Sequence, residues 1–168
     1  MLSRVKSIAA AALCLLATSA AAQVGPGDVF PRFEAAGFEG ILPAMAGRVV
    51  LVDFWASWCA PCQASFPAYA RLNGDYGPRG LVVLAVSVDQ SSDACAAFVR
   101  KLSPPFPVVR DLRQKLVSDV NVPTMPSSYL LGRDGRVRFV HAGFYGERTE
   151  RELRQEIELL LRESAPDK

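Results

Sequence analysis

The sequence lacks three features that would each point to a class of protein. It has no block of like charge, which would indicate a protein that binds nucleic acid or a membrane surface. No apolar run is long enough to span a bilayer. Cysteine is scarce, and the three cysteines that follow position 22 are an odd number, which argues against a small disulfide framework.

The first 22 residues have the order of a secretory signal. Arg4 and Lys6 precede an apolar run at residues 8–17, and small residues follow up to an expected cleavage site after Ala22. A retained anchoring or amphipathic start is the alternative. We therefore expect an exported, periplasmic protein whose residues 23–168 form one soluble domain.

Apolar runs that alternate with helical periodicities predict an α/β protein. Residues 49–55 form an apolar run broken only by Asp53, which is typical of a strand buried on both faces. Cys62, Phe66, Tyr69 and Asn73 then fall at helical spacing, so a helix follows. The later expected elements are a strand at 81–88, a helix at 91–102, a short extended piece after the break at 103–109, a short helix to about 120, two strands at 127–131 and 136–142, and a helix at 149–161.

The order of these elements predicts a central mixed β-sheet flanked by helices. Strand–helix alternation implies parallel pairing through crossovers, and the tight turn GRDG between the last two strands adds an antiparallel edge. Residues 23–47 are rich in glycine, proline and phenylalanine and have no clean period. We expect this segment to be an N-terminal arm with one short hairpin.

Two cysteines, Cys59 and Cys62, lie where the first strand gives way to a helix. Cys59 is expected at the helix N-terminus, where unpaired N–H groups and the helix dipole favour a thiolate. Cys62 lies one turn further along and begins the buried stripe. Because the thiolate is the reactive form, we expect Cys59 to be the exposed attacking residue and Cys62 to resolve the mixed disulfide.

The segment FWASWCAPCQASFP resembles the active-site segment of the thioredoxin superfamily. Within that superfamily, the chain is similar to the exported TlpA/ResA-like thiol–disulfide reductases. The resemblance covers about residues 30–161, which we take as the core of the domain, and it implies a thioredoxin-like fold. The segments that follow the order of that family are VLVDFWASWCAPC, VSVD, FPVVRD, MPSSYLLGRDGRV and HAGF.

The resemblance also implies roles for two residues outside the cysteine pair. Pro126 matches the proline that follows a cis peptide bond, faces the cysteines and presents a client; Met125 precedes it, and Pro123 is a competing candidate. Asp53 matches the buried acid that exchanges a proton with Cys62. The lysine that this superfamily commonly places on the neighbouring strand is missing from LVVLAVSV. We therefore expect the pKa of Asp53 to lie well above that of a free aspartate.

The residues around the cysteines favour a reductant over an oxidant. The spacer residues Ala60 and Pro61 carry no charge and no imidazole that would stabilise the thiolate. We expect them to form the client-docking surface with Trp58 and Met125, although a packing role is the alternative for Trp58.

Partners and cofactors follow from the resemblance. It implies a membrane-embedded disulfide reductase as electron donor, and clients with oxidised cysteines, such as apocytochrome c or a copper-delivery protein. We expect a monomer that uses the redox-active Cys59–Cys62 disulfide, needs no further cofactor or metal, and binds no nucleic acid.

Cys95 and His141 have simple interpretations beside more specific ones. Cys95 lies on the apolar stripe of its helix, where a buried small residue is favoured over a regulatory thiol. His141 is interpreted as a packed or strand-end residue. A metal-delivery site of Cys59, Cys62 and His141 is one alternative function, although zinc would require a fourth ligand. A thiol peroxidase on the same scaffold is another, although Cys59 already has a resolving partner.

Overall fold

The computed structural model describes residues 23–164. The secretory signal expected at residues 1–22 lies outside the described residues, as do the last four residues. In the described part of the chain, no helix is both long enough and apolar enough to cross a membrane.

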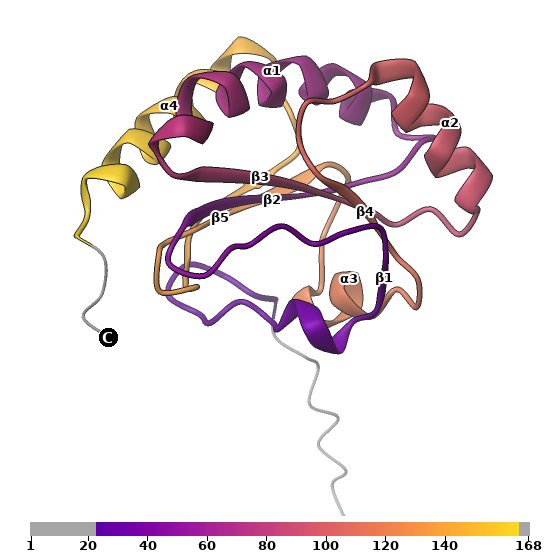
Figure 1. Cartoon of the computed structure of the whole chain (residues 1–168), viewed down its shortest axis with the longest axis horizontal. Helices are drawn as coiled ribbons and strands as arrows, with labels where there is room; N and C mark the ends of the chain where they lie inside the picture. The colour runs from indigo at the N-terminus through magenta and orange to yellow at the C-terminus, as the bar shows by residue number, and fades with distance from the viewer. Residues whose placement is uncertain (1–22, 165–168) are drawn as a thin grey trace, which may run out of the picture.

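Within residues 23–164, the strands form one mixed sheet of six strands in the order β1-β4-β3-β2-β5-β6 (Figure 1). The β2–β3 and β3–β4 pairs are parallel, whereas the β2–β5, β5–β6 and β1–β4 pairs are antiparallel. The predicted mixed sheet is therefore confirmed. The strands are β1 (Phe38–Glu39), β2 (Val49–Trp55), β3 (Leu81–Ser87), β4 (Val108–Asp111), β5 (Ser127–Leu131) and β6 (Val137–Ala142).

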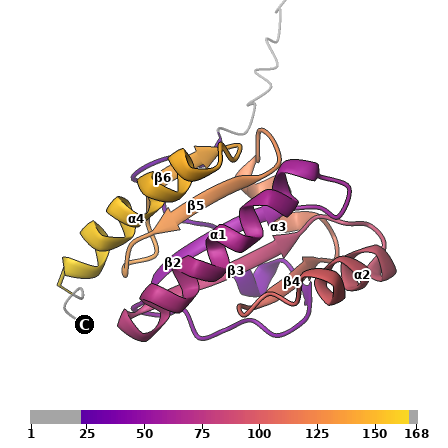
Figure 2. The same cartoon turned by 90° about the horizontal axis from the view of Figure 1, so that it is seen from above.

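Helices cover both faces of the sheet, as Figures 1 and 2 show. α1, α2 and α4 pack on one face, whereas α3 and the short 3-10 helix of the N-terminal arm pack on the other. The helices are α1 (Ala60–Tyr76), α2 (Ser92–Leu102), α3 (Lys115–Val120) and α4 (Glu147–Arg162), with the 3-10 turns η1 (Phe33–Ala35) and η2 (Gly77–Arg79).

The central strand β2 separates two apolar layers. Because successive side chains of a strand point to opposite faces, Val52 and Phe54 join the layer against α3, whereas Leu51 and Trp55 join the layer against α1. All seven residues of β2 are buried, as its apolar run, broken only by Asp53, predicts. Asp53 lies between Leu51 and Trp55 on the same side, so a carboxyl group is placed inside the layer beneath α1.

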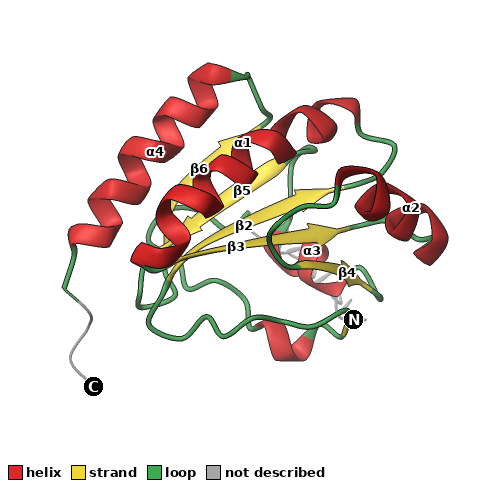
Figure 3. Cartoon of the chain, turned by 45° about the horizontal axis from the view of Figure 1, so that its top comes forward, coloured by secondary structure: helices red, strands yellow, loops and turns green. Residues whose placement is uncertain are grey.

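The predicted strands and long helices agree closely with the structure (Figure 3). The first strand and the strand at residues 127–131 have the predicted bounds, and the helix predicted at 91–102 begins one residue later because Ser91 is its N-cap. The Ser91 hydroxyl accepts a hydrogen bond from the N–H of Ala94.

The hairpin expected within residues 23–47 is wrong. The strand of this segment, β1, pairs with β4, and Val29 forms an isolated bridge with Arg136. Phe30 and Ala36 of the arm are buried in the layer against α3. These two apolar residues of the arm are therefore buried against the domain, and the arm's backbone pairs with strands of the domain instead of with itself.

The layered core predicts unequal effects of two leucines on α4. Leu153 is fully buried in the apolar layer that α4 shares with α1, whereas Leu159 is 55% exposed. Leu153→Ala leaves a cavity and should lower the free energy of unfolding by about 2–5 kcal/mol. Leu159→Ala, the matched control, should change it by no more than about 0.5 kcal/mol. Urea unfolding of both variants measures this, and equal losses would contradict the described packing of α4.

Candidate active site

The two cysteines sit at the junction of β2 and α1. β2 ends at Trp55, and a short loop leads to Cys59, which is the N-cap of α1. The Cys59 Sγ accepts a hydrogen bond from the backbone N–H of Cys62 at 3.3 Å. Pro61 lies in the first turn, where its missing N–H removes no helical hydrogen bond. The sequence thus places a sulfur atom where the unpaired backbone donors of the helix gather.

Cys59 and Cys62 are joined as a disulfide. Cys59 is 4% exposed and Cys62 is 0% exposed. The predicted order of accessibility agrees with these values, but the expectation of an exposed Cys59 is wrong for the oxidised protein. The physical reason is that both sulfurs pack into the apolar layer beneath α1, which leaves only a small part of Cys59 in contact with solvent.

The residues around Cys59 differ sharply in exposure. Trp58 is 72% exposed, and Ala60 and Pro61 are exposed as well. Trp55 is fully buried and packs its ring 4.4 Å from that of Phe98 between the ring centroids. Trp55 is therefore a packing residue, whereas the Trp58 side chain lies at the surface beside the disulfide.

Pro126 lies at the same end of the sheet as the disulfide. The peptide bond between Met125 and Pro126 is cis, and no other cis bond occurs in residues 23–164, so Pro123 is not the cis-proline. β5 begins at the next residue, Ser127, which pairs with Phe54 near the end of β2. This register brings the segment before β5 close to the loop that carries the disulfide. Pro126 is buried and Met125 is partly buried.

A glycine of the HAGF segment supports the Pro126 loop. The N–H of Gly143 donates a hydrogen bond to the carbonyl oxygen of Pro126 at 2.8 Å. Gly143 has a φ of 89°, and a Cβ atom there would lie 3.1 Å from the hydroxyl of Tyr145. Both the backbone conformation and the close Tyr145 ring therefore favour glycine at this position.

Asp53 is fully buried beneath α1. Its Oδ1 accepts hydrogen bonds from the hydroxyls of Tyr69 and Ser128, each at 3.0 Å. Burial raises the pKa of Asp53 to about 7, although the two hydroxyl donors oppose that rise. In register, β3 places Ala85 beside Asp53, so the neighbouring strand offers no cation. The absence of a lysine on the neighbouring strand predicts a raised pKa for Asp53, and the buried environment of its carboxyl agrees with that prediction.

Tyr69 and Ser128 are parts of the site that sequence reasoning did not identify. The helical spacing of Tyr69 to Cys62 predicts its place on the inward stripe of α1, but no local pattern identifies its partner. Ser128 follows Pro126 by two positions and faces the same layer as Asp53, with which it pairs in register. The contact joins residues 75 positions apart in the chain.

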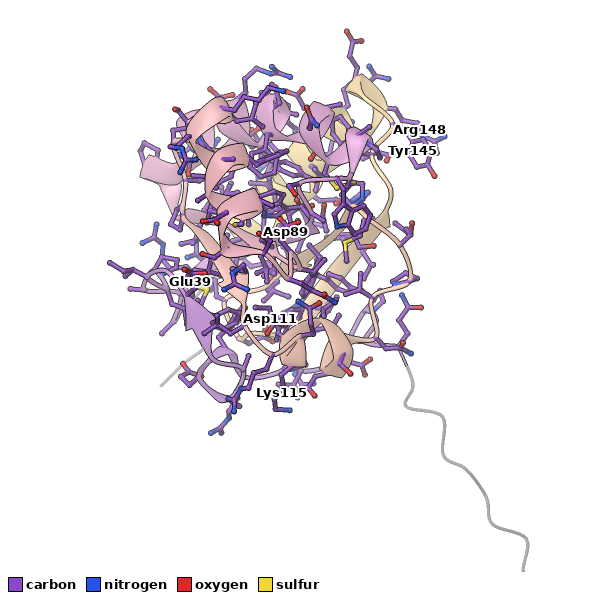
Figure 4. All side chains as sticks on the ribbon, turned by 90° about the vertical axis from the view of Figure 1, so that its right-hand side faces the viewer. Glu39, Asp89, Asp111, Lys115, Tyr145 and Arg148 are labelled. Carbon is purple, nitrogen blue, oxygen red and sulfur yellow. A yellow bond between two sulfur atoms is a disulfide. The ribbon has the colours of Figure 1, made fainter. Side chains whose placement is uncertain are left out.

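A second buried carboxyl, that of Asp89, holds the loop before Cys59. Its two oxygens accept hydrogen bonds from the backbone N–H of Ser57 at 3.0 and 3.1 Å, and the Ser57 hydroxyl donates another at 2.8 Å. The Ser87 hydroxyl donates a further one at 2.8 Å. Figure 4 views the end of the sheet where β2 and β3 finish and labels Asp89 on it. The VSVD segment is one of those that carry the family resemblance, but no local pattern predicts the contact of Asp89 with Ser57.

His141 lies on β6 and contacts α4 instead of the disulfide. One ring nitrogen, Nε2, lies 2.7 Å from a carboxylate oxygen of Glu156, and the other lies 3.8 Å from Glu152. Across residues 23–164, no group of three or more His, Cys, Asp and Glu side chains is arranged to hold a metal ion. The structure thus does not bring together Cys59, Cys62 and His141 as a ligand set.

Cys95 is a free thiol and is buried, in agreement with its simple interpretation. It is 8% exposed on the inward side of α2. Burial raises the pKa of the Cys95 thiol, which disfavours the reactive thiolate.

Burial of Asp53 predicts that the protein becomes less stable as the pH rises. The pKa of this carboxyl is 3.8 in the unfolded chain and about 7 in the folded protein. The contribution of the protonated carboxyl to the free energy of unfolding is complete below pH 3.8 and is lost as the pH rises to about 7. The loss amounts to about 4 kcal/mol.

Comparison with Asp53→Asn isolates this effect, because asparagine does not titrate. The oxidised variant should gain stability relative to the oxidised wild type as the pH rises from about 4 to about 8. Urea unfolding at a series of pH values measures the difference between the two proteins. A difference that stays constant with pH would contradict the raised pKa.

The chain matches the family model described as the AhpC/TSA family over residues 26–140. It is 32% identical over 114 residues to thiol-disulfide oxidoreductase ResA of Bacillus thuringiensis, an alignment that covers 66% of each protein. It is 33% identical over 116 residues to the thioredoxin-like protein YneN of Bacillus subtilis, which covers 67% of this chain and 65% of YneN. The chain thus spans about two thirds of the length of these curated relatives.

Solved structures show the same architecture. A crystal structure from Chlorobium tepidum, described as a thiol:disulfide interchange protein DsbE, is 30% identical, covers 83% of this chain and 99% of its own, and superposes with a TM-score of 0.72. The pneumococcal exposed lipoprotein thioredoxin Etrx1 is 27% identical, covers 69% of this chain and 87% of its own, and gives a TM-score of 0.61. The chain therefore has a thioredoxin-like fold and belongs to the AhpC/TSA family.

Proposed function

We propose that the protein is a thiol–disulfide oxidoreductase that reduces disulfides of exported proteins in the periplasm. The observation that carries this proposal is the Cys59–Cys62 disulfide at the N-terminus of α1, with Cys62 fully enclosed and Cys59 slightly accessible. The names of the relatives support the reaction class. The charged and apolar order of residues 1–22 supports export.

The reaction transfers two electrons from the reduced protein to a client disulfide. The Cys59 thiolate attacks one client sulfur, so that a mixed disulfide forms and the other client sulfur leaves as a thiolate. Cys62 then loses its proton and attacks the Cys59 sulfur. The mixed disulfide breaks, the second client thiolate leaves, and the Cys59–Cys62 disulfide forms.

Asp53 is the group that exchanges a proton with Cys62 in this proposal. A carboxyl with a pKa of about 7 can both accept and return a proton near neutral pH, which an ordinary aspartate does poorly. Both residues belong to the layer beneath α1, and Tyr69 on α1 hydrogen-bonds directly to Asp53.

The client is held by the surface around the disulfide. Trp58, Ala60 and Pro61 are exposed beside Cys59, and Met125 with Pro126 forms the neighbouring loop. The exposed Trp58 ring offers apolar area to a polypeptide. The client classes that we propose are the oxidised cysteines of apocytochrome c or of a copper-delivery protein.

The direction of electron flow rests on the spacer. Ala60 and Pro61 add no charge that would stabilise the thiolate and make the disulfide strongly oxidising. In an oxidising compartment such a protein must be reduced again, and we propose a membrane-embedded disulfide reductase as the donor. We propose that the protein acts as a monomer with the cysteine pair as its redox group.

The reduction potential of the cysteine pair tests the direction of the reaction. Equilibration of the domain with defined thiol buffers should give a value near that of thioredoxin, about −270 mV. A value near that of DsbA, about −120 mV, would mean that the protein forms disulfides instead of reducing them. Absence of any reversible dithiol–disulfide couple would overturn the reaction class itself.

Trapping of clients tests the separate roles of the two cysteines. Cys62→Ser keeps the attacking thiol but removes the resolving one, so mixed disulfides with exported proteins should accumulate on Cys59. Cys59→Ser, the matched control, should trap few or none because Cys62 is enclosed. Non-reducing gels with mass spectrometry measure the adducts. Consumption of peroxide by Cys62→Ser without client adducts would instead favour the peroxidase alternative.

A further inference from the structure

Asp53 makes all of its side-chain hydrogen bonds through one oxygen. Its Oδ1 accepts from Tyr69 and from Ser128, each at 3.0 Å. Its Oδ2 is buried and has no hydrogen-bond partner within residues 23–164. The two oxygens of one carboxyl group are therefore in different environments, although both lie in the same apolar layer.

The two hydroxyls also contact each other and come from the two segments that carry the rest of the site. The oxygen atoms of Tyr69 and Ser128 lie 2.7 Å apart, which closes a triangle with Asp53 Oδ1. Tyr69 lies two turns after Cys62 on α1, and Ser128 lies two residues after Pro126 on β5. The triangle thus joins the resolving cysteine, the cis-proline segment and the central strand.

We propose that Tyr69 and Ser128 are positioning residues that hold Oδ1, so that Oδ2 is the oxygen that exchanges the proton with Cys62. This inference rests on the proton-exchange role proposed for Asp53 above. Neither hydroxyl is assigned a bond-making step. Each acts through the carboxyl group whose orientation it fixes.

The hydrogen-bonding chemistry of the triangle supports this assignment. The two hydroxyls supply two protons for the three contacts of the triangle, so at least one of them donates to Oδ1. This holds whether Asp53 is ionised or protonated on Oδ2, because a carboxylate oxygen and a carbonyl oxygen both accept. Burial holds the pKa of Tyr69 well above its usual value, so Tyr69 keeps its proton and remains a donor.

No other ionisable side chain hydrogen-bonds to Asp53 in the described part of the chain. α1 contributes Tyr69 and the disulfide-bonded Cys62, and β3 contributes Ala85. On β6, His141 pairs in register with Ser128 but directs its ring to Glu156 on α4. Loss of a hydroxyl should therefore act on Asp53 itself and not on a neighbouring charge.

The test measures the proton equilibrium of Asp53 in the oxidised protein, where the disulfide-bonded Cys62 does not titrate. The hydroxyls stabilise the ionised carboxylate, so Tyr69→Phe and Ser128→Ala should each raise the midpoint of its NMR titration by about one pH unit. The pH dependence of disulfide reduction should shift in the same direction. Tyr129→Phe is the matched control, because Tyr129 is an equally buried tyrosine whose ring packs in the opposite layer. It should leave the midpoint unchanged.

Asp53→Asn separates failure of this inference from failure of the proposed role of Asp53. One outcome is that Asp53→Asn removes the titration from the pH profile of activity while neither Tyr69→Phe nor Ser128→Ala shifts its midpoint. In that case the positioning role of the two hydroxyls is wrong and the acid role of Asp53 remains. If Asp53→Asn leaves the profile unchanged, the acid role fails and the positioning role fails with it. An equal shift of the midpoint in Tyr129→Phe would mean that loss of any buried hydroxyl changes the packing around Asp53, and it would overturn the inference. If Tyr69→Phe does not fold, Ser128→Ala decides alone.

Discussion

A carboxyl group enclosed in the middle of the central strand is the constraint on which the rest of the site depends. Burial of an ionised carboxyl without partners is strongly unfavourable, and the neighbouring strand offers Ala85 where a cation would help. The buried carboxyl of Asp53 is therefore stabilised by hydrogen bonds from hydroxyl groups on α1 and β5. Those contacts require α1 and β5 to hold fixed positions relative to β2. The hydrogen bonds that stabilise the buried carboxyl therefore also fix the positions of the segments that carry Cys62 and Pro126.

Asp89 extends this use of buried carboxyls to the loop before the disulfide. Its oxygens accept from both the backbone and the hydroxyl of Ser57, so the loop is held by short-range contacts although its residues belong to no helix or strand. Trp58 and Cys59 follow directly. A large exposed ring and the Cys59 sulfur are thereby held on a fixed piece of backbone, which would lower the entropy lost on docking of the proposed client.

Local patterns predicted the parts of the molecule that local physics determines. The apolar run of β2, the position of Cys59 at the start of α1 and the stripe of α1 each depend on residues a few positions apart, and each agrees with the structure. The cis bond at Pro126 is an implication of the resemblance, in which the spacing to GRDG favours Pro126 over Pro123; composition and periodicity do not indicate a cis bond. The contact of Tyr69 with Ser128 and the pairing of the arm with β4 join distant segments. Such contacts depend on how the layers pack, which composition and periodicity do not specify.

The separation of the core into two layers divides the tasks of the protein. Both redox cysteines, and the tyrosine that contacts the buried acid, belong to the layer beneath α1. The layer on the α3 side contains none of these residues. One half of the interior therefore has to satisfy chemistry as well as packing, whereas the other half has only to be dense and apolar. Sequence change can therefore accumulate in the second half under the looser requirement, while the residues around the Cys59–Cys62 disulfide stay constant.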